Sequence, residues 1–258
     1  ISHLLMIVLI IFHKIYMIKF IKGAIMTKQY IFQPTEPAAI PIKGTTQLFP
    51  IHRIFSVGSN YMAHAKEMGA TVDKTQQEPF YFLKQPSSYV PSGSEMPYPT
   101  RTDNLHYEME FVVAIGKSGA NISQQDAVNH IFGYGCGLDM TRRDLQAKAK
   151  DNRHPWDIAK DFENSAILSE IIPIVQSGEI TEGTIELAVN GEVHQSSDLN
   201  NMIWNVNEII EHLSTLYTLQ PGDIIMTGTP EGVGAVKPDD QITGFVKGIG
   251  ELSVKIIK

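Results

Sequence analysis

The sequence is short of cysteine. Cys136 is the only one among 258 residues, so no disulfide can form within the chain. Disulfides persist in oxidising compartments, whereas a lone thiol is typical of a reducing one. The composition therefore predicts a cytoplasmic protein without covalent cross-links.

Positive charge is also scarce. The 21 Lys and Arg residues are outnumbered by 28 Asp and Glu residues, which gives a formal net charge of -7. A nucleic-acid surface needs a basic patch that neutralises phosphates. We therefore expect no nucleic-acid partner.

The longest apolar run, Leu4 to Phe12, has nine residues. A bilayer needs about 20, so we expect no membrane span. Positive charge follows this run and no small-x-small cleavage site appears, which does not fit a signal peptide. The chain begins with Ile, and residues 1–25 are rich in types that A/T-rich codons encode. We predict that translation starts at Met26 and that residues 1–25 are a translated leader; the alternative is an apolar extension that acts as a membrane anchor or an uncleaved signal.

Two glycine-rich segments lack nucleotide-binding spacing. Gly133 to Gly137 reads GYGCG, without the G-x-G-x-x-G pattern and without a helix after it. The segment GTPEGVGAVK has no Lys-Ser/Thr in register with its glycines. We find no repeat and no linker after Phe55. These features predict one domain over residues 54–258, with residues 26–53 as an N-terminal segment that packs on it.

Short strands and helices alternate without a regular βαβ rhythm, which favours a β-rich α+β fold over a doubly wound sheet. Asn60 is placed to cap a helix that Gly69 ends, and Asn190–Gly191 predicts a two-residue hairpin turn. Other helices are expected from Ser123, over Arg142–Asp151 and over Asn205–Leu219. We expect strands at 54–60, 80–85, 107–116, 184–195, 224–228 and 241–257, and one ending at Asp139.

Two acids stand at the head of the most apolar expected strand. Glu108 and Glu110 are two residues apart, so they share one face of the strand, while Met109, Phe111 and others occupy the opposite face. Paired carboxylates repel one another, and burial without a partner is costly. Either a solvated strand end or a bound cation would relieve the repulsion.

Asp139 adds a third carboxylate at the end of another strand. Carboxylates without nearby Cys or His suit Mg²⁺, Mn²⁺ or Ca²⁺ rather than zinc. Local sequence does not bring Asp139 close to Glu108 and Glu110, so the sequence pattern leaves both interpretations open.

Other segments offer groups for acid–base work and for binding anions. His64 and Glu67 stand one helical turn apart, as a general base and the carboxylate that orients it would. Alternatively, they form an ordinary solvated helix face. Donors to a carboxylate or an oxyanion are available in TRRDLQ and HPWDIAKDF, and in the turn MTGTPEGVG, which could also simply reverse the chain. These donors are Arg143, Gln146, Lys160, Gly228 and Thr229.

The order of these segments resembles the fumarylacetoacetate hydrolase family. The resemblance covers about Phe55 to Leu252, and the segments that carry it are SVGSNYMAHAKEMG, FYFLKQPSSYVPSG, LHYEMEFVVAIG, GYGCGLDMTRRDLQ, PWDIAKDFENSA and PGDIIMTGTPEGVG. The chain looks most like the compact bacterial fumarylpyruvate or acylpyruvate hydrolases, which share the segment from Asp198 to Trp204.

The resemblance implies a mixed β-sandwich roll, a homodimer, and a divalent cation held by Glu108, Glu110 and Asp139, with Mg²⁺ expected and Mn²⁺ or Ca²⁺ as alternatives. It implies that His64 and Glu67 activate water. It assigns substrate contacts or oxyanion stabilisation to further residues: Lys84, Arg143, Gln146, Lys160, Gly228 and Thr229.

The expected reaction is hydrolysis of a carbon–carbon bond in an acylpyruvate, a 1,3-diketo acid, giving pyruvate and a carboxylic acid. The same ligands would suit an oxaloacetate decarboxylase or a keto-acid isomerase or hydratase. A non-catalytic protein that binds a metal or ligand on this fold is a remote alternative.

Overall fold

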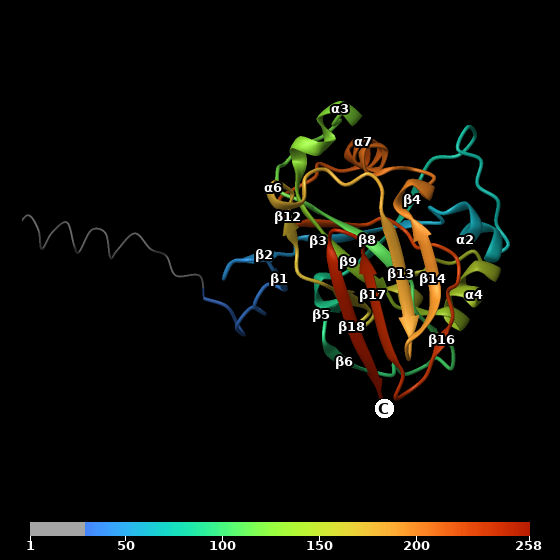
Figure 1. Cartoon of the computed structure of the whole chain (residues 1–258). Coiled ribbons are helices and arrows are strands. Elements are labelled where there is room, and N and C mark those ends of the chain that lie inside the picture. The colour runs from blue at the N-terminus through green and yellow to red at the C-terminus, as the bar shows by residue number, and fades with distance from the viewer. Residues whose placement is uncertain (1–28) are drawn as a thin grey trace, which may run out of the picture. The chain divides into compact units, whose positions relative to one another are not determined.

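The computed structural model describes residues 29–258. The predicted leader over residues 1–25 and the start at Met26 lie outside the described residues. Residues 29–36 belong to a separate unit and contain no helix or strand. The second unit runs from Pro37 to Lys258 and contains all the elements described below (Figure 1). Within residues 29–258, no helix is both long and apolar enough to cross a membrane.

The largest sheet has eight strands and is mixed. In spatial order the strands are β4 (Phe80–Lys84), β3 (Arg53–Gly58), β15 (Asp223–Met226), β8 (Met109–Ile115), β9 (Ile131–Asp139), β11 (Ala166–Leu168) and β5 (Tyr89–Pro91), with β12 (Ile172–Pro173) also paired to β9. The pairs β3–β15 and β11–β5 are parallel, and the other neighbours are antiparallel.

A second sheet has five strands, several of which face the viewer in Figure 1. The predicted hairpin is present, and its turn residues Asn190 and Gly191 have φ angles of 52° and 85°. Such positive values explain the Asn-Gly pair. The strands are β14 (Glu192–Asp198), β13 (Thr184–Val189), β17 (Gln241–Val246), β18 (Gly250–Ile257) and β6 (Ser94–Pro97).

Strand β8 is buried on both faces. Met109, Phe111, Val113 and Ile115 belong to one hydrophobic cluster, which also takes in Leu187 and Val254 of the five-stranded sheet. Each such side chain contributes about 1.5–3 kcal/mol on full burial. The other face of β8 carries Val112 and Ala114, which belong to a second cluster together with Ile40 and Phe49. These last two residues come from the short pair β1 (Ala39–Pro41) and β2 (Leu48–Pro50). The predicted alternation along β8 is therefore confirmed.

Helices and a small sheet surround the two main sheets. The predicted amphipathic helix is α7 (Val206–Leu216), which begins with a capping box between Asn205 and Glu208. The small sheet consists of β10 (Thr141–Arg142), β7 (Leu105–His106) and β16 (Ala235–Val236). The remaining helices are α2 (Met62–Glu67), α3 (Gln124–Ala127), α4 (Arg143–Asp151), α5 (Asp157–Lys160) and α6 (Ile174–Ser177), with 3-10 turns η1 (Pro86–Ser88), η2 (Val128–His130) and η3 (Leu199–Asn201).

The predicted capping role of Asn60 is wrong. Its side chain makes no cap bond to α2, whose preceding residue is Tyr61. Instead, Asn60 donates to the carbonyls of Trp204 and Thr227 and accepts from the Trp204 amide. The buried amide is used more fully there, because both its donor and its acceptor find backbone partners. Gly69 follows the helix with φ of 74°, so the predicted stop is confirmed.

Candidate active site

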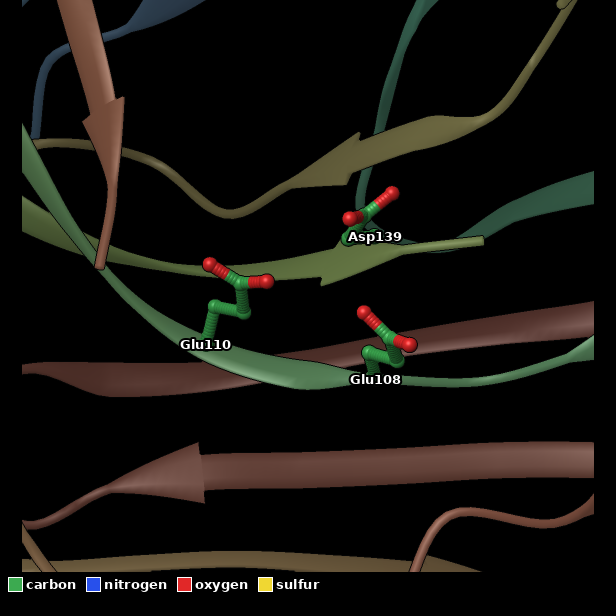
Figure 2. A group of neighbouring side chains, drawn as sticks. All are labelled: Glu108, Glu110 and Asp139. Carbon is green, nitrogen blue, oxygen red and sulfur yellow. The ribbon is translucent and has the colours of Figure 1, made fainter. Parts of the chain in front are cut away.

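Three carboxylates meet where β8 begins and β9 ends. The two strands are antiparallel with Glu110 opposite Gly137, and the Asp139 amide donates to the Glu108 carbonyl at 2.9 Å. One carboxylate oxygen from each acid lies within 4.8 Å of the others. Figure 2 shows the three groups side by side, with Glu108 just before β8 rather than inside the strand. The pairing of two strands thus supplies the proximity that local sequence could not.

All three acids are buried, with 5%, 1% and 0% of Glu108, Glu110 and Asp139 exposed. Burial, together with the charges of Asp139 and Glu108, raises the pKa of Glu110 well above its usual value. Among the described residues, Glu110 accepts one hydrogen bond, from the Gly228 amide at 2.7 Å. Such a group is stabilised as a carboxylate only if another positive charge comes close.

Asp139 has a lysine beside each of its carboxylate oxygens. Lys84 Nζ lies 2.8 Å from Oδ1, and Lys160 Nζ lies 2.7 Å from Oδ2. A cluster of three buried carboxylates in which Glu110 makes no ion pair with any residue from 29 to 258 fits a hard divalent cation. Glu108, Glu110 and Asp139 would be its ligands.

Besides Lys84, two further cations, Lys160 and Arg143, neutralise part of this acidic charge. Lys160 Nζ donates to Glu108, Asp139 and the Thr141 hydroxyl, each at 2.7 Å. Burial alone would lower the pKa of Lys160, but Asp139 and Glu108 outweigh it and the pKa is raised. Burial would likewise raise the pKa of Glu108, yet Lys160 and Arg143 hold it well below its usual value. An ammonium has three protons, so this geometry leaves Lys160 none for an oxyanion.

Lys84 and Gly228 each contact one of the carboxylates, and the substrate contacts expected of them stay a prediction. Lys84 is 1% exposed and lies behind Asp139, where it contacts the Lys160 carbonyl and the Ser165 hydroxyl. Gly228 donates its amide to Glu110. Neither residue lines the cavity described below. Both groups therefore position carboxylates, because an opposite charge or a donor is what a buried acid needs.

His64 and Glu67 form the predicted pair on α2. The imidazole Nδ1 lies 3.2 Å from a Glu67 carboxylate oxygen, and the Gly232 amide donates to Glu67 from the other side. His64 is 6% exposed and faces the cavity. With Nδ1 engaged, Nε2 is the ring nitrogen available to a bound molecule.

A cavity joins these groups. His64, Glu108, Glu110, Arg143, Gln146, Lys160 and Thr229 line it, while Glu67 and Asp139 are not part of its wall. The wall is completed by Val57, Gly58, Ser59, Met68, Phe82, Lys150 and Trp156. A wider hollow beside α7 is a weaker candidate, because the lysine that lines it, Lys74, already pairs with Glu208 at 2.7 Å.

Two residues of α4, Arg143 and Gln146, form a chain of hydrogen bonds that begins at Glu108. Arg143 donates to Glu108 and also, at 2.7 Å, to the side-chain oxygen of Gln146. Since its oxygen is engaged, the Gln146 amide presents its NH₂ group as the free donor. His106 accepts from Arg143 Nε at 3.4 Å. Burial, followed by the Arg143 charge, lowers the pKa of His106 to about 4, so the ring is neutral.

Sequence reasoning missed Gln195. This fully buried side chain on β14 accepts from the Met109 amide at 3.0 Å and donates to Thr229 Oγ1 and the Pro230 carbonyl at 2.8 Å. Met109 stands between Glu108 and Glu110, so this one amide links the acidic pair to the turn that carries Thr229. A single Gln in a hairpin carries no local signal of such a role.

Known proteins resemble this chain over most of its length. Residues 53–257 match the family model described as fumarylacetoacetate (FAA) hydrolase C-terminal. A fumarylpyruvate hydrolase from Ralstonia sp is 53% identical over 189 residues, which are 73% of this chain and 98% of that protein. A mitochondrial oxaloacetate tautomerase from Arabidopsis thaliana is 39% identical over 204 residues, 79% of this chain and 90% of that protein.

The fold has a solved counterpart. The crystal structure of fumarylpyruvate hydrolase from Pseudomonas aeruginosa in complex with Mn²⁺ and pyruvate has a TM-score of 0.86 and 44% sequence identity. The match covers 89% of this chain and 99% of that one. The expected mixed β-sandwich roll, of α+β class, is thereby confirmed.

Proposed function

This chain belongs to the fumarylacetoacetate hydrolase family, and we propose that it cleaves a carbon–carbon bond in an acylpyruvate such as fumarylpyruvate. The products would be pyruvate and a carboxylic acid. One observation carries the proposal: a cluster of three buried carboxylates that fits a cation lies beside a cavity into which His64 of the His–Glu pair faces. The fumarylpyruvate hydrolase from Ralstonia sp, at 53% identity, supports this choice of substrate.

Glu108, Glu110 and Asp139 would hold the cation. Mg²⁺ is our first choice, and Mn²⁺ is supported by the complex of the Pseudomonas aeruginosa enzyme. When bound, the ion would supply Lewis-acid polarisation of the substrate's 2-oxo acid end. Gly228 and Lys84 would keep Glu110 and Asp139 in place whether or not the ion is present.

His64 would act as general base. Glu67 holds Nδ1, so Nε2 can remove a proton from water next to the carbonyl carbon of the acyl group. The carboxylate would also stabilise the imidazolium that results. A positioned general base contributes about 10²–10⁴-fold to rate.

The attacked carbonyl oxygen becomes negative and needs donors. Gln146 offers its free NH₂ group, and Arg143 offers positive charge from the same helix. Lys160 would contribute mainly by charge, since its three protons already bond Glu108, Asp139 and Thr141. The Thr229 hydroxyl lines the cavity beside Glu110 and would contact the substrate carboxylate. Such pre-positioned donors are often the largest contribution to catalysis.

A keto-acid isomerase is the second candidate, because relatives include oxaloacetate tautomerases at 38–39% identity. That reaction also moves a proton next to a ketone, so it would use the same cavity. Carbon–carbon hydrolysis additionally needs water at the acyl carbonyl. A comparison of kcat/KM for fumarylpyruvate hydrolysis and for oxaloacetate tautomerisation would separate the two.

The test uses protein stripped with EDTA and reloaded with Mg²⁺ or Mn²⁺. Hydrolysis is followed as the decrease in diketo-acid absorbance. It should stop in the stripped protein and return on reloading. We expect Glu110→Ala to abolish both Mn²⁺ binding, measured by calorimetry, and turnover. We expect His64→Ala to bind Mn²⁺ normally while kcat falls about 10²–10⁴-fold. His52→Ala is the matched control, because His52 is exposed and does not line the cavity.

Unchanged turnover in His64→Ala would remove this pair from the reaction. A kcat/KM for oxaloacetate far above that for every acylpyruvate would favour the isomerase. The family resemblance also supports a homodimer, which analytical ultracentrifugation would test.

A further inference from the structure

One face of α4 carries a third polar residue beyond Arg143 and Gln146. Arg143, Gln146 and Lys150 follow one another at spacings of three and four residues, so they lie on the same side of the helix. All three line the cavity. The axial rise from Arg143 to Lys150 is about 10 Å at 1.5 Å per residue. The helix therefore presents polar groups along an elongated ligand and not only at its reacting end.

Lys150 differs from the other cations of the cavity in having no partner. Lys160 and Arg143 are paired with the acids, whereas Lys150 makes no ion pair with any residue from 29 to 258. Its side chain is exposed in part, as expected for the outer edge of a cavity. Burial and the charge of Arg143 lower the pKa of Lys150. An anion bound there would relieve the repulsion between these two positive groups.

An aromatic wall holds the Lys150 ammonium in position. Lys150 Nζ lies 5.0 Å from the centroid of the Trp156 ring, within the range of a cation–π contact. Trp156 in turn packs on Phe82, with ring centroids 6.0 Å apart, and both rings line the cavity together with Met68. A flat apolar wall that leads from the reacting groups to a cation suits an unsaturated chain with a charged end.

We propose that Lys150, supported by Trp156, binds a second carboxylate at the far end of the acyl group and so selects dicarboxylic acylpyruvates over neutral ones. The inference rests on the proposed function, because the far end is defined by a pyruvate unit held at the acids. Lys150 takes no part in the bond cleavage. It sets which acyl groups are accepted.

The test compares fumarylpyruvate, whose acyl group ends in a carboxylate, with acetylpyruvate, whose acyl group is neutral. In Lys150→Met we expect the ratio of kcat/KM values, fumarylpyruvate over acetylpyruvate, to fall about 10- to 100-fold, as loss of a charge-assisted hydrogen bond implies. The fall should come mainly from KM for fumarylpyruvate. Lys150→Arg keeps the charge and should retain most of the ratio, and Lys150→Glu should lower it further.

Lys148→Met is the control. Lys148 is an exposed lysine of the same helix and does not line the cavity, so the ratio should not change. Inhibition provides a readout without turnover: fumarate should lose more affinity than crotonate, which has one carboxylate less, when Lys150 is replaced by Met. This measurement also serves if a variant is too inactive for kinetics.

The possible outcomes distinguish failure of the proposed function from failure of the carboxylate subsite at Lys150. Wild-type protein that hydrolyses neither substrate would defeat the proposed function. Wild-type hydrolysis with an equal loss on both substrates in Lys150→Met, or with no loss on either, would overturn the carboxylate subsite and leave the proposed function standing.

Discussion

Replacing Gln195 with Leu should disturb the acidic pair without touching it. The substitution keeps an apolar group of similar size and removes an amide that bonds the Met109 N–H, the Thr229 hydroxyl and the Pro230 carbonyl. The Thr229 hydroxyl can rotate to another partner. The Met109 amide and the Pro230 carbonyl are backbone groups in a buried region and cannot.

Each buried backbone group left without a partner costs about 1–3 kcal/mol. Two such groups give an expected loss of roughly 2–6 kcal/mol in the free energy of unfolding. For a domain of this size, one kcal/mol corresponds to about 2–4 °C, so Tm should fall by roughly 4–24 °C. Since Met109 stands between Glu108 and Glu110, the Kd for Mn²⁺ should also rise, by about tenfold or more.

Urea unfolding in EDTA, followed by tryptophan fluorescence, measures the first effect, and calorimetry with Mn²⁺ measures the second. Gln241→Leu is the matched control. Gln241 is a half-buried glutamine on β17 that bonds the carbonyls of Ile242 and Val254 and does not line the cavity. We expect its loss to cost under about 1 kcal/mol and to leave the Mn²⁺ Kd unchanged.

Stability of Gln195→Leu within about 0.5 kcal/mol of the wild type would refute the reasoning, since that is the range of inert surface changes. An unchanged Mn²⁺ Kd would refute the link between this amide and the acidic pair. Gln195→Asn retains an amide with both a donor and an acceptor, one methylene shorter, and should lie between the two, which keeps the test usable if the Leu variant does not fold.

Two other perturbations follow from buried groups. Lys84→Met removes the ammonium that lies 2.8 Å from Asp139. The free energy of unfolding should fall by about 3–5 kcal/mol in EDTA, and by less with saturating Mn²⁺. Equal losses in both conditions would argue that Lys84 and the metal ion do not balance the same negative charge. Cys136 is fully buried, and burial raises the pKa of its thiol to about 12, so a thiol reagent at pH 8 should label the native protein only on unfolding. Rapid labelling in the absence of denaturant would contradict this.

Much of the fold could be predicted from local patterns. The alternation over Met109 to Ile115 assigned two faces, and the structure buries each in a different cluster. Asn190–Gly191 and Gly69 gave a turn and a stop, because positive φ angles strongly favour these residue types. The capping prediction for Asn60 was wrong because its side chain bonds the backbone of Trp204, 144 residues away. Local sequence does not show that such a distant partner is available.

The site was predictable only in part. The side-by-side acids Glu108 and Glu110 followed from strand geometry, but Asp139 comes close only through the register of β8 with β9. Arg143 and Gln146 were predicted as donors, whereas Lys150, four residues further along the same helix face, was not. Gln195 lies in another sheet and reaches the site through tertiary packing alone.

Strand β8 lies between two cores, whereas α4 is a short helix with an exposed edge. The acids that would anchor the cation therefore come from a part of the molecule with little freedom to adjust, and the contacts to the acyl group come from one that is easily altered. In such an arrangement, exchange of a few helix residues could open the enzyme to new compounds while the reactive centre is inherited intact.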